Sequence, residues 1–190
     1  MHATLCDYVA DIVQNAVEAA ADKVVLEIRT GREWIGVTIR DNGKGMSPAM
    51  LAAARNPFWT EPGKHAARRV GLGLPFLQQV VDTTGGRLDV ATAVGEGTTV
   101  DFTFLADHWD TPPLGDIPST VVGLMVFKGE FDLVLRREHA GRHYELSRSE
   151  LTEALGDLAQ ADSLALARRY VRSQEAGLLD GPEGEELWKS

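Results

Sequence analysis

The chain has 190 residues, of which 44% are hydrophobic and 25% are charged, and its 19 basic and 28 acidic residues give a net charge of −9. This composition is typical of a folded protein with its own core and excludes a disordered chain. A single cysteine excludes intrachain disulfides, no apolar run reaches the roughly 20 residues that cross a bilayer, and the acidic balance argues against a nucleic-acid partner. We therefore expect a cytoplasmic protein whose partners are small ligands or proteins, with no membrane and no nucleic acid.

The first half of the chain alternates between helix and strand patterns. Apolar residues three and four apart predict amphipathic helices over 4–21 and 75–84, and a short helix is expected over 48–55. Alternation of apolar and polar residues predicts four half-buried strands, at 24–29, 34–39, 87–91 and 98–105.

The composition shifts after residue 106. Segment 107–118 contains three prolines and is typical of a linker or an extended crossing segment. Beyond it we expect a hairpin of two strands, 120–127 and 131–136. Ser147 with Glu150 three residues on predicts a capped helix, a second helix follows over about 162–174, and 181–190 is expected to be frayed. The expected domains are 1–110 and a small C-terminal accessory module with its linker, 111–190.

The first predicted helix has one polar face that could hold a ligand. Asp11 and Asn15 are four residues apart and Glu18 is three further on, so the three share a face. An asparagine oxygen is a suitable hard ligand for Mg²⁺, which otherwise keeps water and takes phosphate oxygens. A solvated polar face is the alternative.

A glycine-containing run, Asp41-Asn42-Gly43-Lys44-Gly45-Met46, follows the second predicted strand. Two glycines two residues apart let the backbone approach a flat ligand, and a carboxylate at the strand end can accept from an exocyclic amine such as that of adenine. A tight turn is the alternative, because Asp, Asn and Gly also favour turns.

A second glycine run, Gly71-Leu72-Gly73-Leu74, opens the helix predicted over 75–84. Amides at a helix N-terminus form an anion site, although this run is neither a P-loop nor a Rossmann fingerprint. The basic residues Lys64, His65, Arg68 and Arg69 precede it, and Thr98 follows a Gly-Glu-Gly turn.

Taken in order, these motifs resemble the superfamily of gyrase, heat-shock chaperone, histidine kinase and MutL ATPases, over about residues 4–105. VGLGLPFLQQVVDTTGGRLDVATAVGEGTTVDFTF (70–104) resembles the histidine kinases most. DIVQNAVEA (11–19) is similar to their asparagine box, DNGKGM (41–46) to the first glycine box, and NPFWTEPGK (56–64) to the phenylalanine box and lid.

The resemblance implies ATP and Mg²⁺ as cofactors and gives each motif a role. Asn15 would bind Mg²⁺ between the phosphates, and Asp41 would accept from the adenine amino group. The base pocket would be shaped by Gly43, Gly45 and Met46, with Thr98 near the adenine. The phosphates would be cradled by the amides of Gly71, Leu72, Gly73 and Leu74.

The resemblance also implies a lid and a catalytic carboxylate. Phe58 and Lys64 would belong to a mobile lid over residues 56–70. Family members that hydrolyse ATP have a glutamate four residues before the asparagine, where this chain has Asp11, one methylene shorter. Asp11 is therefore the candidate general base.

The fold implied is an α/β two-layer sandwich: a mixed, mostly antiparallel sheet with helices on one face, plus the small C-terminal extension. Only 14 residues precede Asn15, so we expect no phosphoacceptor-histidine domain of the chain's own. The first hypothesis is an ATPase or kinase subunit acting on a separate protein partner, possible as a homodimer. The alternative is a non-catalytic, ATP-dependent interaction switch.

Overall fold

The computed structural model describes residues 4–56 and 73–180 of the chain. Its helices and strands follow in the order α1 (Leu5–Glu18), β1 (Lys23–Thr30), β2 (Trp34–Asp41), α2 (Pro48–Ala54), α3 (Gly73–Thr83), β3 (Arg87–Ala93), β4 (Gly97–Leu105), α4 (Ile117–Met125), β5 (Asp132–His139), β6 (Arg142–Ser147), α5 (Arg148–Leu155) and α6 (Ala161–Leu179). None of these described helices is long and apolar enough to cross a membrane.

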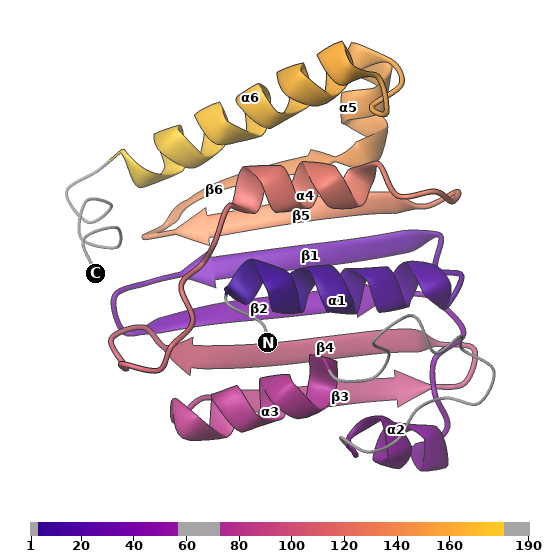
Figure 1. Ribbon diagram of the computed structural model, residues 1–190, viewed down its shortest axis with the longest axis vertical. Helices are drawn as coiled ribbons and strands as arrows, with labels where there is room; N and C mark the ends of the chain where they lie inside the picture. The colour runs from indigo at the N-terminus through magenta and orange to yellow at the C-terminus, as the bar shows by residue number, and fades with distance from the viewer. Residues whose placement is uncertain (1–3, 57–72, 181–190) are drawn as a thin grey trace.

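The strands form a single six-stranded sheet in the order β3-β4-β2-β1-β5-β6 (Figure 1). Neighbouring strands are antiparallel except for β1 and β5, which run parallel. The sheet therefore joins the first half of the chain to the second through the β1–β5 pair. The division into domains at residue 110 stays a prediction, and the structure adds that both parts share a sheet.

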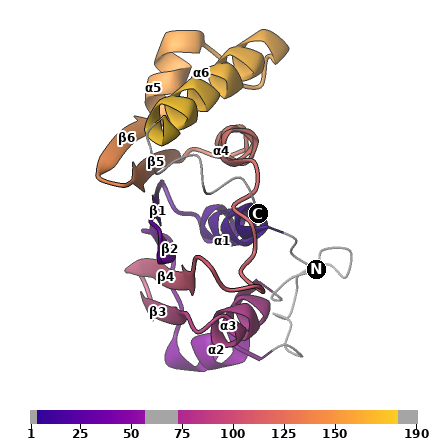
Figure 2. The ribbon, with the colours of Figure 1, turned by 90° about the vertical axis from the view of Figure 1, so that its left-hand side faces the viewer.

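The helices α1, α3 and α4 cover one face of the sheet, whereas no described helix lies over the other face of β1 to β4 (Figure 2). The buried side chains of both halves, from Leu5 on α1 to Val171 on α6, belong to one hydrophobic cluster. The predicted two-layer fold with a mixed, mostly antiparallel sheet is confirmed.

The proline-containing segment before α4 holds the start of α1. The backbone N–H of Leu5 donates to Pro113 O at 2.8 Å, and that of Cys6 donates to Leu114 O at 3.1 Å. The first amides of a helix lack partners within the helix, so these bonds satisfy two of them. Thr4 and Asp7 complete the N-terminus as a capping box.

The hairpin predicted from strands 120–127 and 131–136 is wrong. Residues 117–125 form α4, with Asp116 as N-cap and Pro118 in the first turn, while the hairpin consists of β5 and β6. The buried residues Val121, Leu124 and Met125 are spaced three and four apart, so the helix places them on its packed face. Burial against the sheet outweighed the β-branched valines that suggested a strand.

The two C-terminal helices follow the prediction more closely. Ser147 and Glu150 form the predicted capping box of α5, and the second helix, α6, is longer than expected at 19 residues. Residues 181–190 lie outside the described part of the chain.

A buried ion pair anchors α6 to the sheet. The guanidinium of Arg137 on β5, whose side chain is 0% exposed, donates to both carboxylate oxygens of Glu175 at 2.8 and 3.1 Å. Arg137 also donates to Ile28 O of β1, and the Tyr144 hydroxyl of β6 donates to Glu175. Burial, then the neighbouring Glu175 carboxylate, raises the pKa of Tyr144. The pair thus ties three strands to one helix.

Candidate functional site

The glycine run after β2 lies against the end of α1. The backbone N–H of Lys44 donates to Ala19 O at 2.9 Å. A Cβ built on Gly43 would lie 2.8 Å from Ala19 O and 3.0 Å from Asp41 Oδ1, so this position admits only glycine without movement. The first two predicted motifs, separated in sequence, therefore meet at one end of the sheet.

Asp41 is half-buried at the end of β2, on the face covered by helices, because it alternates with the buried Ile39. Its carboxylate accepts from the Gly43 N–H at 2.8 Å and from the Thr98 N–H. Burial raises the pKa of Asp41, and these two amide donors offset part of that effect. A partly desolvated carboxylate is a strong and selective acceptor for an amine donor.

Backbone packs closely against backbone around the second glycine of the run. Gly45 has φ +61°, and a Cβ there would lie 1.9 Å from Ala93 O. Gly97, with φ +86°, approaches Asp41 O in the same way, at 2.0 Å from the built Cβ. The two turns are also joined by the Gly95 N–H, which donates to Lys44 O at 2.8 Å. The floor of the expected base pocket is thus made of two interlocked glycine turns.

Thr92 on β3 connects these turns and was missed by the sequence analysis. Its hydroxyl accepts from the Met46 N–H at 2.9 Å, donates to Gly97 O at 2.9 Å, and lies 3.0 Å from the Thr98 hydroxyl. Thr92 is the Cα partner of Thr98, which in turn is opposite Asp41. Thr92 comes directly after the strand predicted over 87–91, so no predicted element included it.

Asp11 and the third motif are brought together although 62 positions separate them. The backbone of Gly73, the first residue of α3, packs on Asp11: a Cβ there would lie 3.5 Å from Asp11 Oδ2. The side chain of Leu74 is partly buried and packs against the core. Asn15 is exposed one turn further along α1, near the end that contacts the glycine run.

Four predicted residues, Phe58, Lys64, Gly71 and Leu72, lie outside the described part of the chain. Within residues 4–56 and 73–180, no group of three or more His, Cys, Asp or Glu side chains could hold a metal ion. Mg²⁺ would therefore take few protein ligands, as Asn15 alone implies, and fill its shell with phosphate oxygens and water. This donor set fits a metal that enters with a nucleotide.

A sequence model of the family described as "Histidine kinase-, DNA gyrase B-, and HSP90-like ATPase" matches residues 3–108. The sensor histidine kinase YxdK of Bacillus subtilis is 27% identical over 101 residues, which are 51% of this chain and 31% of that protein. The C4-dicarboxylate transport sensor protein DctB of Pseudomonas aeruginosa is 35% identical over 95 residues, 47% of this chain and 15% of that protein. The chain spans less than a third of the length of these relatives.

Among solved structures, the N-terminal domain of a DNA repair protein has a TM-score of 0.51 at 15% identity, over 82% of this chain and 57% of that one. At this identity the likeness is one of fold. The 82% covered exceeds the 106 of 190 residues between 3 and 108, so the shared fold includes part of the C-terminal region.

Proposed function

Because the chain belongs to the histidine kinase-, DNA gyrase B- and HSP90-like ATPase family, we propose that it binds ATP with Mg²⁺ and acts as an ATPase or kinase subunit on a separate protein. The observation that carries the proposal is Asp41. It is a half-buried carboxylate at a strand end, held by two backbone amides and flanked by glycine turns that pack closely on neighbouring backbone.

Asp41 would recognise adenine through the exocyclic amino group. The Gly43 and Thr98 amides fix the carboxylate, so it meets the base without losing side-chain freedom. Guanine presents a carbonyl at the position where adenine has its amine, and two acceptors facing each other in a partly buried site repel. Asp41 therefore favours adenine over guanine nucleotides.

The other end of the nucleotide would lie at the N-terminus of α3. Backbone amides there favour phosphate, and Gly73 allows close approach. The metal would supply charge neutralisation between the phosphates, with the Asn15 side-chain oxygen as its ligand. Asp11, which packs on Gly73, would orient or deprotonate a nucleophile near the terminal phosphate.

A separate protein is proposed as the phosphoryl acceptor because the described histidines lie away from this end. His139 is buried at the far end of β5, opposite Thr30, and its Nδ1 lies 2.9 Å from the Thr30 hydroxyl. His143 lies on β6, opposite Glu138, two strands beyond β1. The third described histidine, His108, follows β4 after Leu105, at the opposite end of that strand from Thr98.

The non-catalytic switch is the second candidate, and the length of Asp11 favours it. An aspartate reaches one methylene less far than the glutamate found at this position in hydrolysing members. A nucleophile left out of reach would give ATP binding without turnover.

Calorimetry tests the nucleotide site. The parent should bind ATP in preference to GTP, and more tightly with Mg²⁺ than without. Asp41→Asn should weaken ATP by about 1–3 kcal/mol, because an amide offers the base a donor where an acceptor is needed. Asp101→Asn on β4, where the carboxylate accepts from Thr38 on the helix-free face, is the matched control and should leave ATP affinity unchanged. Equal ATP and GTP affinity in the parent would refute the role of Asp41.

Two further measurements separate the candidates. Asn15→Ala should abolish the tightening by Mg²⁺ while ATP still binds without the metal. Incubation with γ-³²P-ATP and co-purified protein should label the partner if the chain is a kinase and release labelled phosphate if it is an ATPase. If ATP binds but neither labelled partner nor labelled phosphate is formed, the chain is the non-catalytic switch.

A further inference from the structure

The strand β6 is the last strand on one side of the sheet, so one side of its backbone faces no neighbouring strand among the described residues. It is joined to β5 by the two-residue turn 140–141, in which φ is positive at both positions, as in a type I′ hairpin. In such a hairpin the flanking residues, here His139 and Arg142, exchange the closing pair of backbone hydrogen bonds. The turn therefore fixes which backbone groups of β6 bond to β5.

Hydrogen-bonded and non-hydrogen-bonded positions alternate along β6, starting from this closing pair. The N–H and C=O groups of His143, Glu145 and Ser147 consequently point away from β5. The Ser147 N–H donates to the Glu150 carboxylate in the capping box of α5, at 2.8 Å. Within residues 4–56 and 73–180, no group bonds to the outward N–H and C=O of His143 and Glu145. These two residues form an open edge, which can pair with a further strand.

The helix α6 lies beyond β6, on the side away from α4 (Figure 1). Its buried stripe runs through Val171, and Arg172, one position later, contacts Asp116 at the start of α4 at 3.7 Å. Leu166 and Tyr170 lie on the opposite flank of the stripe, away from α4, and are 46% and 47% exposed. A strand added at the open edge would lie beside this apolar flank.

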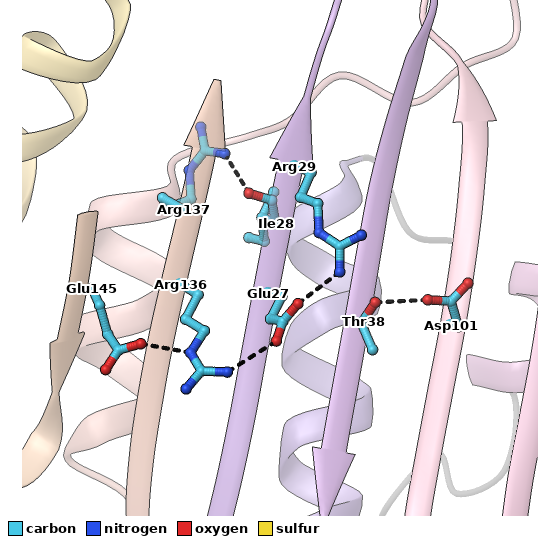
Figure 3. A network of polar contacts seen from close by, with 8 residues as sticks. All are labelled: Glu27, Ile28, Arg29, Thr38, Asp101, Arg136, Arg137 and Glu145. Atoms are coloured by element: carbon cyan, nitrogen blue, oxygen red, sulfur yellow. Dashed lines mark hydrogen bonds and ion pairs between the residues drawn. The ribbon is translucent and has the colours of Figure 1, made fainter. Parts of the chain in front are cut away.

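On the helix-free face of the sheet, a row of alternating charges crosses the strands and stops at the open edge (Figure 3). Glu27 on β1, Arg136 on β5 and Glu145 on β6 are register partners in turn. Arg136 donates to Glu27 at 3.2 Å and also to Glu145. In the described part of the chain, the exposed Glu145 carboxylate has no other partner. Because the row ends on a carboxylate, a basic residue in the next strand would continue it.

We propose that an extended segment of the protein partner adds to the sheet along β6, with a lysine or arginine opposite Glu145 and an apolar residue on each side of it in sequence. Side chains alternate along a strand, so the basic residue would lie on the face of the charge row. Its apolar neighbours would lie on the helical face, beside Tyr170. The inference rests on the proposed function for the existence of a partner, and it names the chemistry that the partner presents.

A second copy of this chain fits the open edge less well. Two β6 strands paired about a two-fold axis would bring both α6 helices over the same joint, because α6 lies beyond β6 in each copy (Figure 1). A single extended segment brings no helix with it. Its main chain can pair with His143 and Glu145 while its apolar residues cover the exposed flank of α6.

The test uses the full chain, labelled with ¹⁵N, and the peptide Ac-Thr-Val-Lys-Val-Thr-NH₂, whose lysine can lie opposite Glu145. Amide shifts should appear at His143 and Glu145 and not along β3, the other edge strand. The same peptide with glutamate at its centre should bind about fivefold more weakly, because it places two carboxylates opposite each other. A peptide with proline at its centre lacks the N–H that pairs with β6 and should not bind.

Two variants of the chain test the charge and the backbone separately. Glu145→Lys should reverse the charge preference, so that the glutamate peptide binds more tightly than the lysine peptide. His143→Pro removes an N–H that points away from β5, so the fold should persist while peptide binding is lost. His143→Ala is the matched control: it keeps this N–H and should leave peptide affinity unchanged. Thermal denaturation confirms that each variant is folded.

The flank of α6 is tested by Tyr170→Ala. This variant should raise the dissociation constant of the lysine peptide about fivefold, because an apolar contact with the added strand is lost. Arg169→Ala is its control, since Arg169 is exposed on the same helix but one position closer to the solvent side of α6. It should leave the dissociation constant unchanged.

Three results would overturn the proposal: no amide shifts along β6, equal weakening by His143→Ala and His143→Pro, or no reversal of the charge preference in Glu145→Lys. A dimer in sedimentation that His143→Pro dissociates would assign the edge to a second copy and would also overturn it. ATP affinity is measured on the same samples by calorimetry. Peptide binding without ATP binding would keep the open edge and refute the proposed function, while the reverse result would refute only the open edge.

Discussion

Two regions of this molecule are held together by different physical means: the glycine turns at the proposed nucleotide site, and the β5–β6 edge of the sheet with α6. At the proposed nucleotide site, glycine turns interlock through backbone, and a built Cβ on Gly45 or Gly97 would meet a carbonyl oxygen at 1.9 or 2.0 Å. At the β5–β6 end, a buried ion pair between Arg137 and Glu175 joins the sheet to α6. The glycine turns depend on the absence of a Cβ atom, whereas the β5–β6 edge depends on the charged groups of two side chains.

The contrast explains why only one end could be interpreted from motifs. Glycines two residues apart after a strand form a local pattern that any reader of the sequence can find. Arg137 and Glu175 are 38 residues apart, and nothing in the intervening sequence links them. Motif analysis finds sites built from short backbone runs and overlooks those built from distant side chains.

Removing one partner of the ion pair should have the largest effect. Glu175→Ala should lower the free energy of unfolding by about 3–5 kcal/mol, because Arg137 is left as an uncompensated buried charge. The double variant Arg137→Met with Glu175→Leu should recover most of that loss. Urea denaturation measures both. A single-variant loss below about 1 kcal/mol would show that the pair contributes no more than an exposed one.

Adding a methyl group to Gly45 in the glycine turns should lower the free energy of unfolding by nearly as much. Gly45→Ala should destabilise the folded protein by about 2–5 kcal/mol. This is the sum of the cost of holding an alanine in the left-handed conformation and the cost of its steric overlap with the backbone. Gly95→Ala is the control: it has φ +81° but no atom within 4 Å of the built Cβ, so only the left-handed cost remains. Equal losses in the two variants would show that φ, and not the close approach to Ala93, requires the glycine.

Thr92→Val tests the hydroxyl that connects the two glycine turns. The Met46 amide would lose its acceptor, so stability should fall by about 1–3 kcal/mol, and ATP affinity should fall with it. Thr99→Val, on the opposite face, should change stability by less than about 0.5 kcal/mol. If Thr92→Val leaves both stability and ATP affinity unchanged, water replaces the hydroxyl and Thr92 does not organise the pocket.

The smallest expected effect concerns the N-cap of α4. Hydrogen bonds from Ser119 lower the pKa of Asp116 below its usual 3.8. The cap is therefore fully effective above that value and is lost as the pH falls through the lowered pKa. Asp116→Ala should cost about 1 kcal/mol at pH 7. The difference from the parent should shrink below pH 3.8, whereas Asp116→Asn should keep a cap that does not titrate. Denaturation at several pH values checks this, and a constant difference would contradict it.

The sequence alone determined the two-layer fold, most element boundaries in the first half, and the motifs of the candidate site. The boundaries follow from apolar periodicity and from glycine and capping residues, which act over a few positions, whereas the two-layer fold was implied by the resemblance of the ordered motifs to a known family. The helix 117–125 was mistaken for a strand because its two adjacent β-branched valines favour a strand locally, and packing against the sheet outweighed that preference.

Only the tertiary structure decided which distant residues meet. It placed Asp11 against Gly73, put Thr92 between two glycine turns, and joined β5 to β1 so that the C-terminal region continues the sheet. It also turned Arg40 and Asp41, neighbours in sequence, to opposite faces. The reason is physical: strand pairing and burial are set by surfaces that exist only after the chain has folded, whereas turns and caps are already specified by adjacent residues.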